Sequence, residues 1–130
     1  MIVLDASALV DLLLRRPAAT AIEERVFVAG EEVHAPHLID LEVAQVLRRF
    51  VAAGYLAPSR ADECFVDLAD LGLRRHPHHF LLSRVWELRA NLTAYDGIYV
   101  ALAEALAAPL LTCDRRLGGA SGHRAVIEVV

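Results

Sequence analysis

The stretch Thr93–Asp114, TAYDGIYVALAEALAAPLLTCD, contains the signals of a helix and a strand in direct succession. Thr93 or Asp96 can cap a helix that runs to about Ala107. The apolar run Pro109–Cys113 that follows has the length and composition of a short buried strand. A helix that leads directly into such a strand is typical of α/β folds.

The rest of the chain repeats this alternation. Further strands are predicted over 1–4, 32–35, 73–76 and 125–130, a loop over 118–122, and further helices from Asp5 or Ser7 to Leu14, over 18–29, over 38–53, from a Ser59 cap to Leu71, and from His78 or Phe80 to Ala90. The pattern predicts an α/β fold with a central, mainly parallel sheet of about four or five short strands. At 130 residues the chain fits one domain over 1–130.

The chain is rich in apolar residues. They make up 56% of it, against about 45–50% in a typical globular protein. The surplus around Leu12–Leu14 and Val46–Phe50 predicts a surface for a homodimer or for a partner's segment. No run approaches about 18 uninterrupted apolar residues and no basic leader is present, so we expect a cytoplasmic protein with no membrane association. Cys64 and Cys113 are then expected to be reduced thiols.

The charge pattern excludes several classes of protein. The net charge is −4 and all 13 basic residues are Arg, so the chain as a whole is not a basic nucleic-acid binder. The absence of Lys excludes a P-loop and a Schiff-base site. It also argues against a phosphatase of the haloacid-dehalogenase kind, which needs a Lys and a second Asp where this chain has Ser7.

Four acidic residues are placed so that they could meet. Asp5 follows the first strand and Asp114 follows the strand Pro109–Cys113, so both should emerge at the same edge of a parallel sheet. Glu42 and Asp96 lie near the starts of two helices. Carboxylates brought together repel one another unless a cation compensates, and Mg²⁺ or Mn²⁺ prefers such oxygen ligands. Spacing alone leaves open that each acid is an ordinary helix cap, turn or surface residue.

Three sequence blocks resolve this ambiguity through a resemblance. IVLDASALVDLLL, APHLIDLEVAQVLRR and LTAYDGIYVALAEALAAPLLTCDRRL resemble the conserved blocks of PIN-domain proteins, and among these the VapC-type toxins of type II VapBC toxin–antitoxin systems. The resemblance extends from Ile2 to about Leu117 and is most specific in the last block. One departure is Gly97, where the family more often has Ala.

The resemblance implies a PIN-like three-layer α/β/α sandwich and a metal-dependent endoribonuclease. The family's catalytic and metal-binding acids fall on Asp5, Glu42, Asp96 and Asp114, and its supporting polar residues on Ser7 and Thr112. The implied cofactor is Mg²⁺ or Mn²⁺ and the implied substrate is RNA, whose cleavage inhibits translation and growth. The implied partner is a small VapB-type antitoxin.

Within this framework the residues suggest individual roles. Asp5 and Asp96 are the expected direct metal ligands, and Glu42 and Asp114 complete the shell or orient the attacking water. Arg115 and Arg116, beside Asp114, are candidates for holding RNA phosphates, although paired Arg residues are often only solvated.

Other interpretations stay open at this point. The chain could be a stand-alone PIN nuclease in RNA processing or an inactive PIN-like scaffold. The run His76–His79 invites a zinc site, but a surface cluster at a helix start is favoured because no further ligand has suitable spacing. Tyr95 and Tyr99 flank Asp96 and could stack on a base, although packing against a neighbouring helix is favoured.

Overall fold

The computed structural model describes residues 1–130 and contains a central five-stranded sheet. The strands are β1 (Ile2–Leu4), β2 (Val33–Pro36), β3 (Arg74–His76), β4 (Leu110–Thr112) and β5 (Ile127–Val129), in the order β3-β2-β1-β4-β5. Every neighbouring pair is parallel. The predicted parallel α/β sheet is therefore confirmed, and β1 and β4 lie side by side near its centre.

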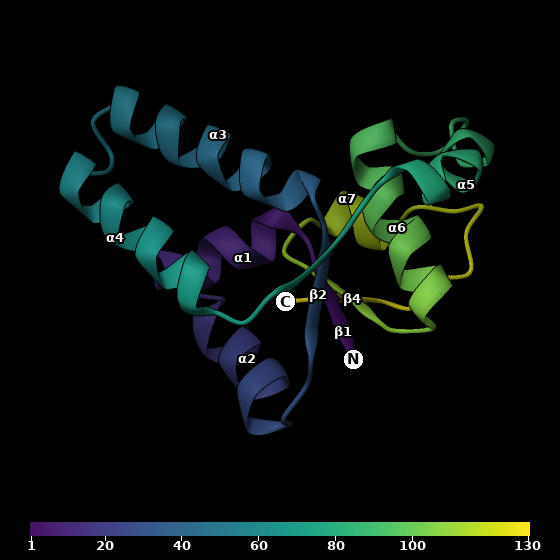
Figure 1. Ribbon diagram of the computed structural model, residues 1–130, viewed down its shortest axis with the longest axis horizontal. Coiled ribbons are helices and arrows are strands. Elements are labelled where there is room, and N and C mark those ends of the chain that lie inside the picture. The colour runs from purple at the N-terminus through teal and green to yellow at the C-terminus, as the bar shows by residue number, and fades with distance from the viewer.

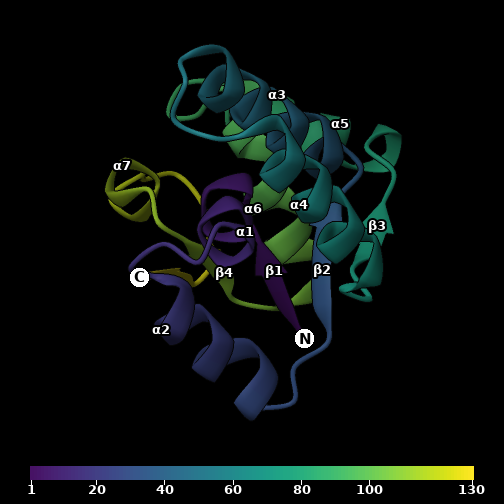
Figure 2. The same cartoon turned by 90° about the vertical axis from the view of Figure 1, so that its left-hand side faces the viewer.

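Helices cover both faces of the sheet (Figure 1). One face carries α1 (Ala6–Leu13), α2 (Ala19–Glu23), α3 (Leu38–Ala52) and α4 (Pro58–Asp70), and the other carries α5 (Leu82–Glu87) and α6 (Ala94–Leu106). The short helix α7 (Arg115–Gly118) follows β4. Figure 2 looks onto the first of these faces, with the strands behind it. This arrangement is the three-layer sandwich that the family resemblance implies.

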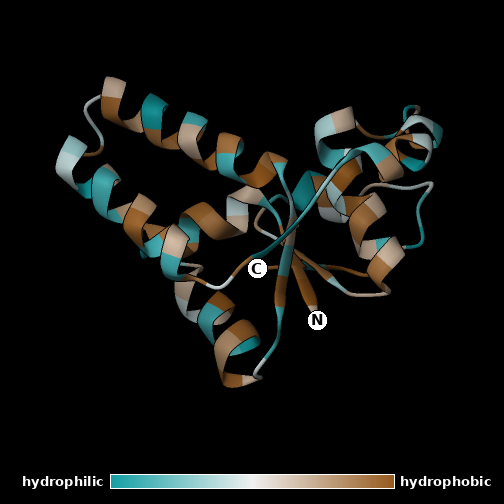
Figure 3. Ribbon diagram, viewed as in Figure 1, coloured by the Kyte–Doolittle hydropathy of each residue, from teal (hydrophilic) through white to brown (hydrophobic).

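The hydrophobic core lies between these layers. β1 is completely buried, and α1 and α6 press Leu9 and Leu102 against the sheet with at most 1% of each residue exposed. Figure 3 shows apolar colouring on β1 and on much of α1 and α6, whereas the edge strand β3 is hydrophilic. None of the helices is both long and apolar enough to cross a membrane.

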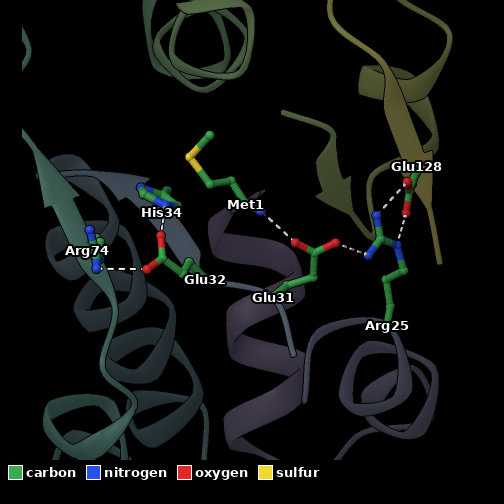
Figure 4. A network of polar contacts seen from close by, with 7 residues as sticks. All are labelled: Met1, Arg25, Glu31, Glu32, His34, Arg74 and Glu128. Atoms are coloured by element: carbon green, nitrogen blue, oxygen red, sulfur yellow. Dashed lines mark hydrogen bonds and ion pairs between the residues drawn. The ribbon is translucent and has the colours of Figure 1, made fainter. Parts of the chain in front are cut away.

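Ion pairs tie the strands together at their amino ends (Figure 4). The Met1 amino group contacts Glu31 at 2.6 Å, and Arg25 binds both Glu31 and Glu128. These contacts connect the starts of β1 and β2 to the edge strand β5. At the opposite, carboxyl ends of the strands lie the acidic residues that follow β1 and β4, Asp5 and Asp114.

The buried face of α3 differs from the expected one. The sequence predicts an apolar side made of Leu38, Leu41, Ala44, Val46, Leu47 and Phe50. In the structure Ile39, Val43 and Leu47 are buried, one residue every four, whereas Leu41 is 72% exposed. The helix carries apolar residues around most of its circumference, so hydrophobicity alone does not select the face that meets the sheet.

The other differences between the predicted and the observed elements concern where helices begin and end. The predicted helix over 18–29 continues from α2 into a π-helical turn, Glu24–Val28. Pro58 opens α4 and Ala57 precedes it, so Ser59 is not the cap. The helix predicted up to Ala90 is a 3₁₀ turn, His79–Leu81, followed by the shorter α5. No helix was predicted over 115–118, where α7 lies; it is only four residues long, too short to give a periodic pattern.

Candidate active site

The four acidic residues singled out in the sequence come from four different elements at the carboxyl edge of the sheet. Asp5 caps α1 directly after β1, and Asp114 caps α7 just after β4, the neighbouring strand. Glu42 lies in the second turn of α3, which follows β2, and Asp96 lies in the first turn of α6. Strands β1 and β4 are parallel neighbours, and a hydrogen bond from Tyr99 of α6 to Glu42 links α6 to α3, so the fold brings the four acids to the same edge.

Asp5 is the most firmly held of the four. Its Oδ1 accepts hydrogen bonds from the Ala8 backbone N–H at 2.9 Å and from the Ser7 hydroxyl at 2.7 Å. Its Oδ2 accepts a hydrogen bond from the Thr112 hydroxyl. Only 7% of Asp5 is exposed. Burial raises the pKa of this carboxyl, with a further contribution from the charge of Asp96, although the three hydrogen bonds oppose the shift.

Ser7 and Thr112 join the ends of the two central strands. The Ser7 Oγ accepts the Cys113 backbone N–H at 2.9 Å, and the Thr112 Oγ1 accepts the Asp114 backbone N–H at 2.9 Å. Both hydroxyls also bind Asp5. The two side chains therefore fix one carboxylate and the backbone that carries another.

Glu42 is held from α6. The Tyr99 hydroxyl donates a hydrogen bond of 2.7 Å to Glu42 Oε1. Burial raises the pKa of Glu42, and the charges of Asp5 and Asp96 raise it further against the effect of this hydrogen bond. This contact was not predicted from the sequence. The position of Tyr99, three residues after Asp96 on the same helix, could have indicated a shared face.

Asp96 and Asp114 are close enough for the charge of Asp114 to act on Asp96. Burial raises the pKa of Asp96, and the charge of Asp114 adds to the shift. Burial also acts to raise the pKa of Asp114, but hydrogen bonds from the Arg116 backbone and side chain, with its charge, lower it on balance. Arg116 is the only basic residue that forms an ion pair with any of the four acids, at 3.5 Å from Asp114.

The chemistry of these donors fits a hard divalent cation. Asp5, Glu42 and Asp96 are partly or largely buried carboxylates that form no ion pair within the protein, and only Asp96 feels the charge of a nearby Arg, Arg116. Such an arrangement costs free energy unless a cation is supplied. The surrounding donors are hydroxyls rather than soft thiolates or amines. As the side chains stand, no three His, Cys, Asp or Glu residues are close enough together to enclose an ion. The carboxylates thus share one edge without closing into a cage.

The remaining candidates have different surroundings. Arg115 and Arg116 are both exposed on α7, and the Arg116 side chain is 93% exposed. Tyr99 is packed in the interior with 2% exposed, as expected, whereas Tyr95 is 65% exposed, contrary to the packing that we favoured. A Cβ on Gly97 would meet a Val85 methyl at an ordinary 3.5 Å, so the family's Ala would fit there.

The histidine run has a structural role near this edge. The His78 Nε2 accepts the backbone N–H of Leu38, the first residue of α3, at 2.9 Å. His76 shares a 2.9 Å hydrogen bond with His34, a buried residue of β2 that the sequence analysis did not single out. No metal-binding group includes them. The zinc interpretation is therefore unsupported, and the histidines fasten β3 to β2 and to the start of α3.

Comparison with known proteins identifies the family. Residues 2–121 match the PIN domain family. The chain belongs to the PIN-domain family. Among its relatives in this family, ribonuclease VapC12 of Mycobacterium tuberculosis is 44% identical over 130 residues, which cover 100% of this chain and 99% of the relative. Ribonuclease VapC9 of the same organism is 42% identical and is covered to 98%.

Solved structures with the PIN fold superpose on the chain over nearly its full length. PAE2754 from Pyrobaculum aerophilum has a TM-score of 0.71 at 22% identity, over 98% of this chain and 83% of that protein. VapC20 of Mycobacterium tuberculosis, described as a sarcin–ricin loop cleaving toxin, has a TM-score of 0.69 at 14% identity, over 97% and 98%. At these identities the match supports the PIN fold alone.

Proposed function

We propose that this PIN-domain protein is a metal-dependent endoribonuclease that acts as the toxin of a VapBC toxin–antitoxin pair and inhibits translation by cleaving RNA. The observation that carries the proposal is the placement of Asp5, Glu42, Asp96 and Asp114 at one edge of the sheet. The full-length relatives that share 42–44% of the sequence are named VapC ribonucleases, which supports the same activity. The three larger cavities of the surface, 440–480 Å³, are lined by none of these acids.

Asp5 and Asp96 are the proposed direct ligands of Mg²⁺ or Mn²⁺, and Glu42 and Asp114 complete the shell directly or through water. A divalent cation bound there lowers the pKa of a coordinated water and offsets charge on the phosphate oxygens. Asp5 is pre-positioned for binding because three donors fix its orientation. Asp114, whose pKa is lowered, stays ionised at neutral pH and can orient a water molecule as a hydrogen-bond acceptor.

Arg115 and Arg116 are the proposed contacts to RNA phosphates. Both are exposed in the first two positions of α7, directly after Asp114. The Arg115 guanidinium forms no ion pair within the protein, and Arg116 makes only a 3.5 Å contact to Asp114. Two exposed guanidinium groups next to the acidic edge can bind phosphate oxygens.

A small antitoxin is the proposed partner, and the chain has a surface that suits its apolar segment. A cavity of about 440 Å³ is lined by Leu14, Arg16, Phe50, Tyr55, Leu56 and Arg60. It lies in the region of the apolar surplus found in the sequence. Two solved structures with similar folds are described as a VapBC pair from Rickettsia felis and a toxin–antitoxin complex from Klebsiella pneumoniae. A segment that combines apolar and acidic side chains would complement this cavity.

We also propose a homodimer in the cytoplasm. Three apolar side chains on and around α5 are more than half exposed: Phe80 (55%), Leu82 (56%) and Trp86 (66%). Three large apolar side chains exposed within seven residues of one another support self-association through this segment. Light scattering of the purified chain tests the stoichiometry, and a monomeric mass at high concentration would contradict it.

Cleavage of RNA by the purified chain tests the main proposal. Total RNA is incubated with wild type, with Asp96→Asn and with Asp70→Asn, each with Mg²⁺, with Mn²⁺ and with EDTA. Asp70 is an exposed acid at the end of α4 and provides a matched control. We expect metal-dependent cutting by wild type and by the control, and none by Asp96→Asn. Equal cutting by all three proteins, or cutting that survives EDTA, would contradict the proposal.

A further inference from the structure

Tyr99 carries a hydroxyl into a part of the molecule where an apolar ring would be sufficient for packing. The residue is 2% exposed and is among the largest fully buried side chains of the chain. Its phenol group makes one hydrogen bond, to Glu42 Oε1 at 2.7 Å. A buried hydroxyl costs free energy unless it is paired, so this group depends on the carboxylate as its partner.

The partner of Tyr99 needs this support as well. Glu42 reaches the acidic edge from the second turn of α3 through a side chain with several rotatable bonds. No Arg or His pairs with it, and it lies within electrostatic reach of Asp5 and Asp96. Repulsion from these two acids would turn an untethered Glu42 side chain away from the site. The Tyr99 hydroxyl occupies one of its oxygens and leaves the other, Oε2, without a partner inside the protein.

Helix α6 couples this tether to a second acid. Asp96 and Tyr99 are three residues apart in the first turns of α6, so they lie on the same face of the helix. The charges of Asp5, Asp96 and Glu42 all act on the Tyr99 phenol group. Helix α6 therefore carries Asp96 and, through Tyr99, also holds Glu42. Glu42 belongs to α3, which lies on the opposite face of the sheet.

We propose that Tyr99 is a positioning residue that fixes Glu42 with Oε2 available to the metal ion, and so reduces the entropy lost when the ion binds. This inference rests on the proposed function, because it assigns a role within the same site. Tyr99 is too deeply buried to touch RNA. Its hydroxyl should therefore influence metal affinity and turnover without changing the affinity for the substrate.

The test uses Tyr99→Phe, which keeps the ring and removes only the hydroxyl. Mn²⁺ binding to the intact protein is measured by calorimetry without RNA, alongside Tyr95→Phe as the control. Tyr95 lies on the same helix, is exposed and forms no hydrogen bond through its hydroxyl. We expect Mn²⁺ to bind roughly tenfold more weakly to Tyr99→Phe and with unchanged affinity to Tyr95→Phe. In RNA cleavage at limiting Mn²⁺, kcat should fall while KM for RNA stays constant.

Two further variants show whether Tyr99 acts through Glu42. If it does, adding Tyr99→Phe to Glu42→Gln should weaken Mn²⁺ binding no further than Glu42→Gln alone. Fully additive losses, or wild-type affinity in Tyr99→Phe, would overturn the inference. Absence of Mn²⁺ binding to the wild type would overturn it together with the metal site. Intact Mn²⁺ results without RNA cleavage would support the role of Tyr99 and contradict only the proposed activity.

Discussion

At the scale of single residues, the decisive feature is the environment of Asp5. Its two carboxylate oxygens together accept three hydrogen bonds, two from groups of helix α1 and one from strand β4. Burial nevertheless raises its pKa, because these donors replace only part of the lost hydration. The sequence indicates the importance of Asp5 through its position after a strand. The pairing with Thr112, 107 residues away, depends on the strand order, which no local pattern specifies.

Thr112→Val tests this environment, because valine keeps the shape of threonine and removes its hydroxyl. The substitution removes the donor to Asp5 Oδ2 and the acceptor for the Asp114 N–H. We expect the free energy of unfolding to fall by about 1–3 kcal/mol and RNA cleavage to drop at least tenfold. Chemical denaturation and cleavage assays measure the two effects. Thr20→Val, at an exposed position of α2, should change neither, and a fully active Thr112→Val would contradict the role of the hydroxyl.

At the scale of elements, α6 is the helix that organises the site. It begins at a Thr93 cap, presents Asp96 in its first turn, and directs Tyr99 towards α3. An ion pair fixes its far end: Arg84 of α5 binds Glu104 through two hydrogen bonds of 2.7 and 3.0 Å. The Glu104 side chain is only 7% exposed and also accepts the Arg124 N–H. This contact joins α5, α6 and the segment that leads to β5.

Removal of the Arg84 guanidinium should leave Glu104 as a poorly hydrated charge. We expect Arg84→Met to lower the free energy of unfolding by about 2–4 kcal/mol at neutral pH. Arg84 lowers the pKa of Glu104 below its usual 4.5, so the stabilisation is present above pH 4.5 and is lost as the pH falls through the lower, folded-state value.

The difference between Arg84→Met and wild type should therefore shrink in acid. Urea unfolding at pH 7 and at about pH 3 measures it. Arg48→Met provides the control, since Arg48 is exposed on α3 and forms no ion pair. A difference that is as large in acid as at neutral pH would indicate that the loss comes from the packing of the Arg84 stem and not from its charge.

The sequence predicts some elements much better than others. The helix and strand of residues 94–112 have their own cap, periodicity and apolar run, and their bounds agree with the structure to within a residue or two. The π-helical turn after α2 and the four residues of α7 have no such local signal. Leu41 is exposed because another face of α3 packs against the protein, and His34 is buried because β3 lies beside β2. Those choices are made by tertiary packing.

At the scale of the whole molecule, the charges are distributed unequally between the two ends of the sheet. Most acids at the amino ends and on the helices pair with Arg, as in the network of Arg25, Glu31 and Glu128. The acids Asp5, Glu42 and Asp96 at the carboxyl end have no such partner. The protein thus holds an uncompensated negative charge in one place, and its stability should depend on what neutralises that charge.

Divalent metal should therefore raise the thermal stability of the entire chain. With Mn²⁺ at about one hundred times its Kd, mass action predicts a stabilisation of about 2.7 kcal/mol. Differential scanning calorimetry with Mn²⁺ or EDTA measures the shift in Tm. We expect a clear increase for wild type and a much smaller one for Asp5→Asn. An equal increase for both proteins would place the stabilising metal somewhere else on the surface.

The hydroxyl bridge between Ser7 and Thr112 has a consequence for the time at which activity can appear. The two residues are separated by 105 positions, and between them they bind Asp5 and the backbone of Asp114. Synthesis delivers Asp5 first, and Asp114 follows only when most of the chain has left the ribosome. A nascent chain that already displays α1 to α5 still lacks β4 and half of the acidic edge. With the proposed activity, the chain would be unable to attack the RNA around it during synthesis, and a restraining partner would be needed only once the last strands are in place.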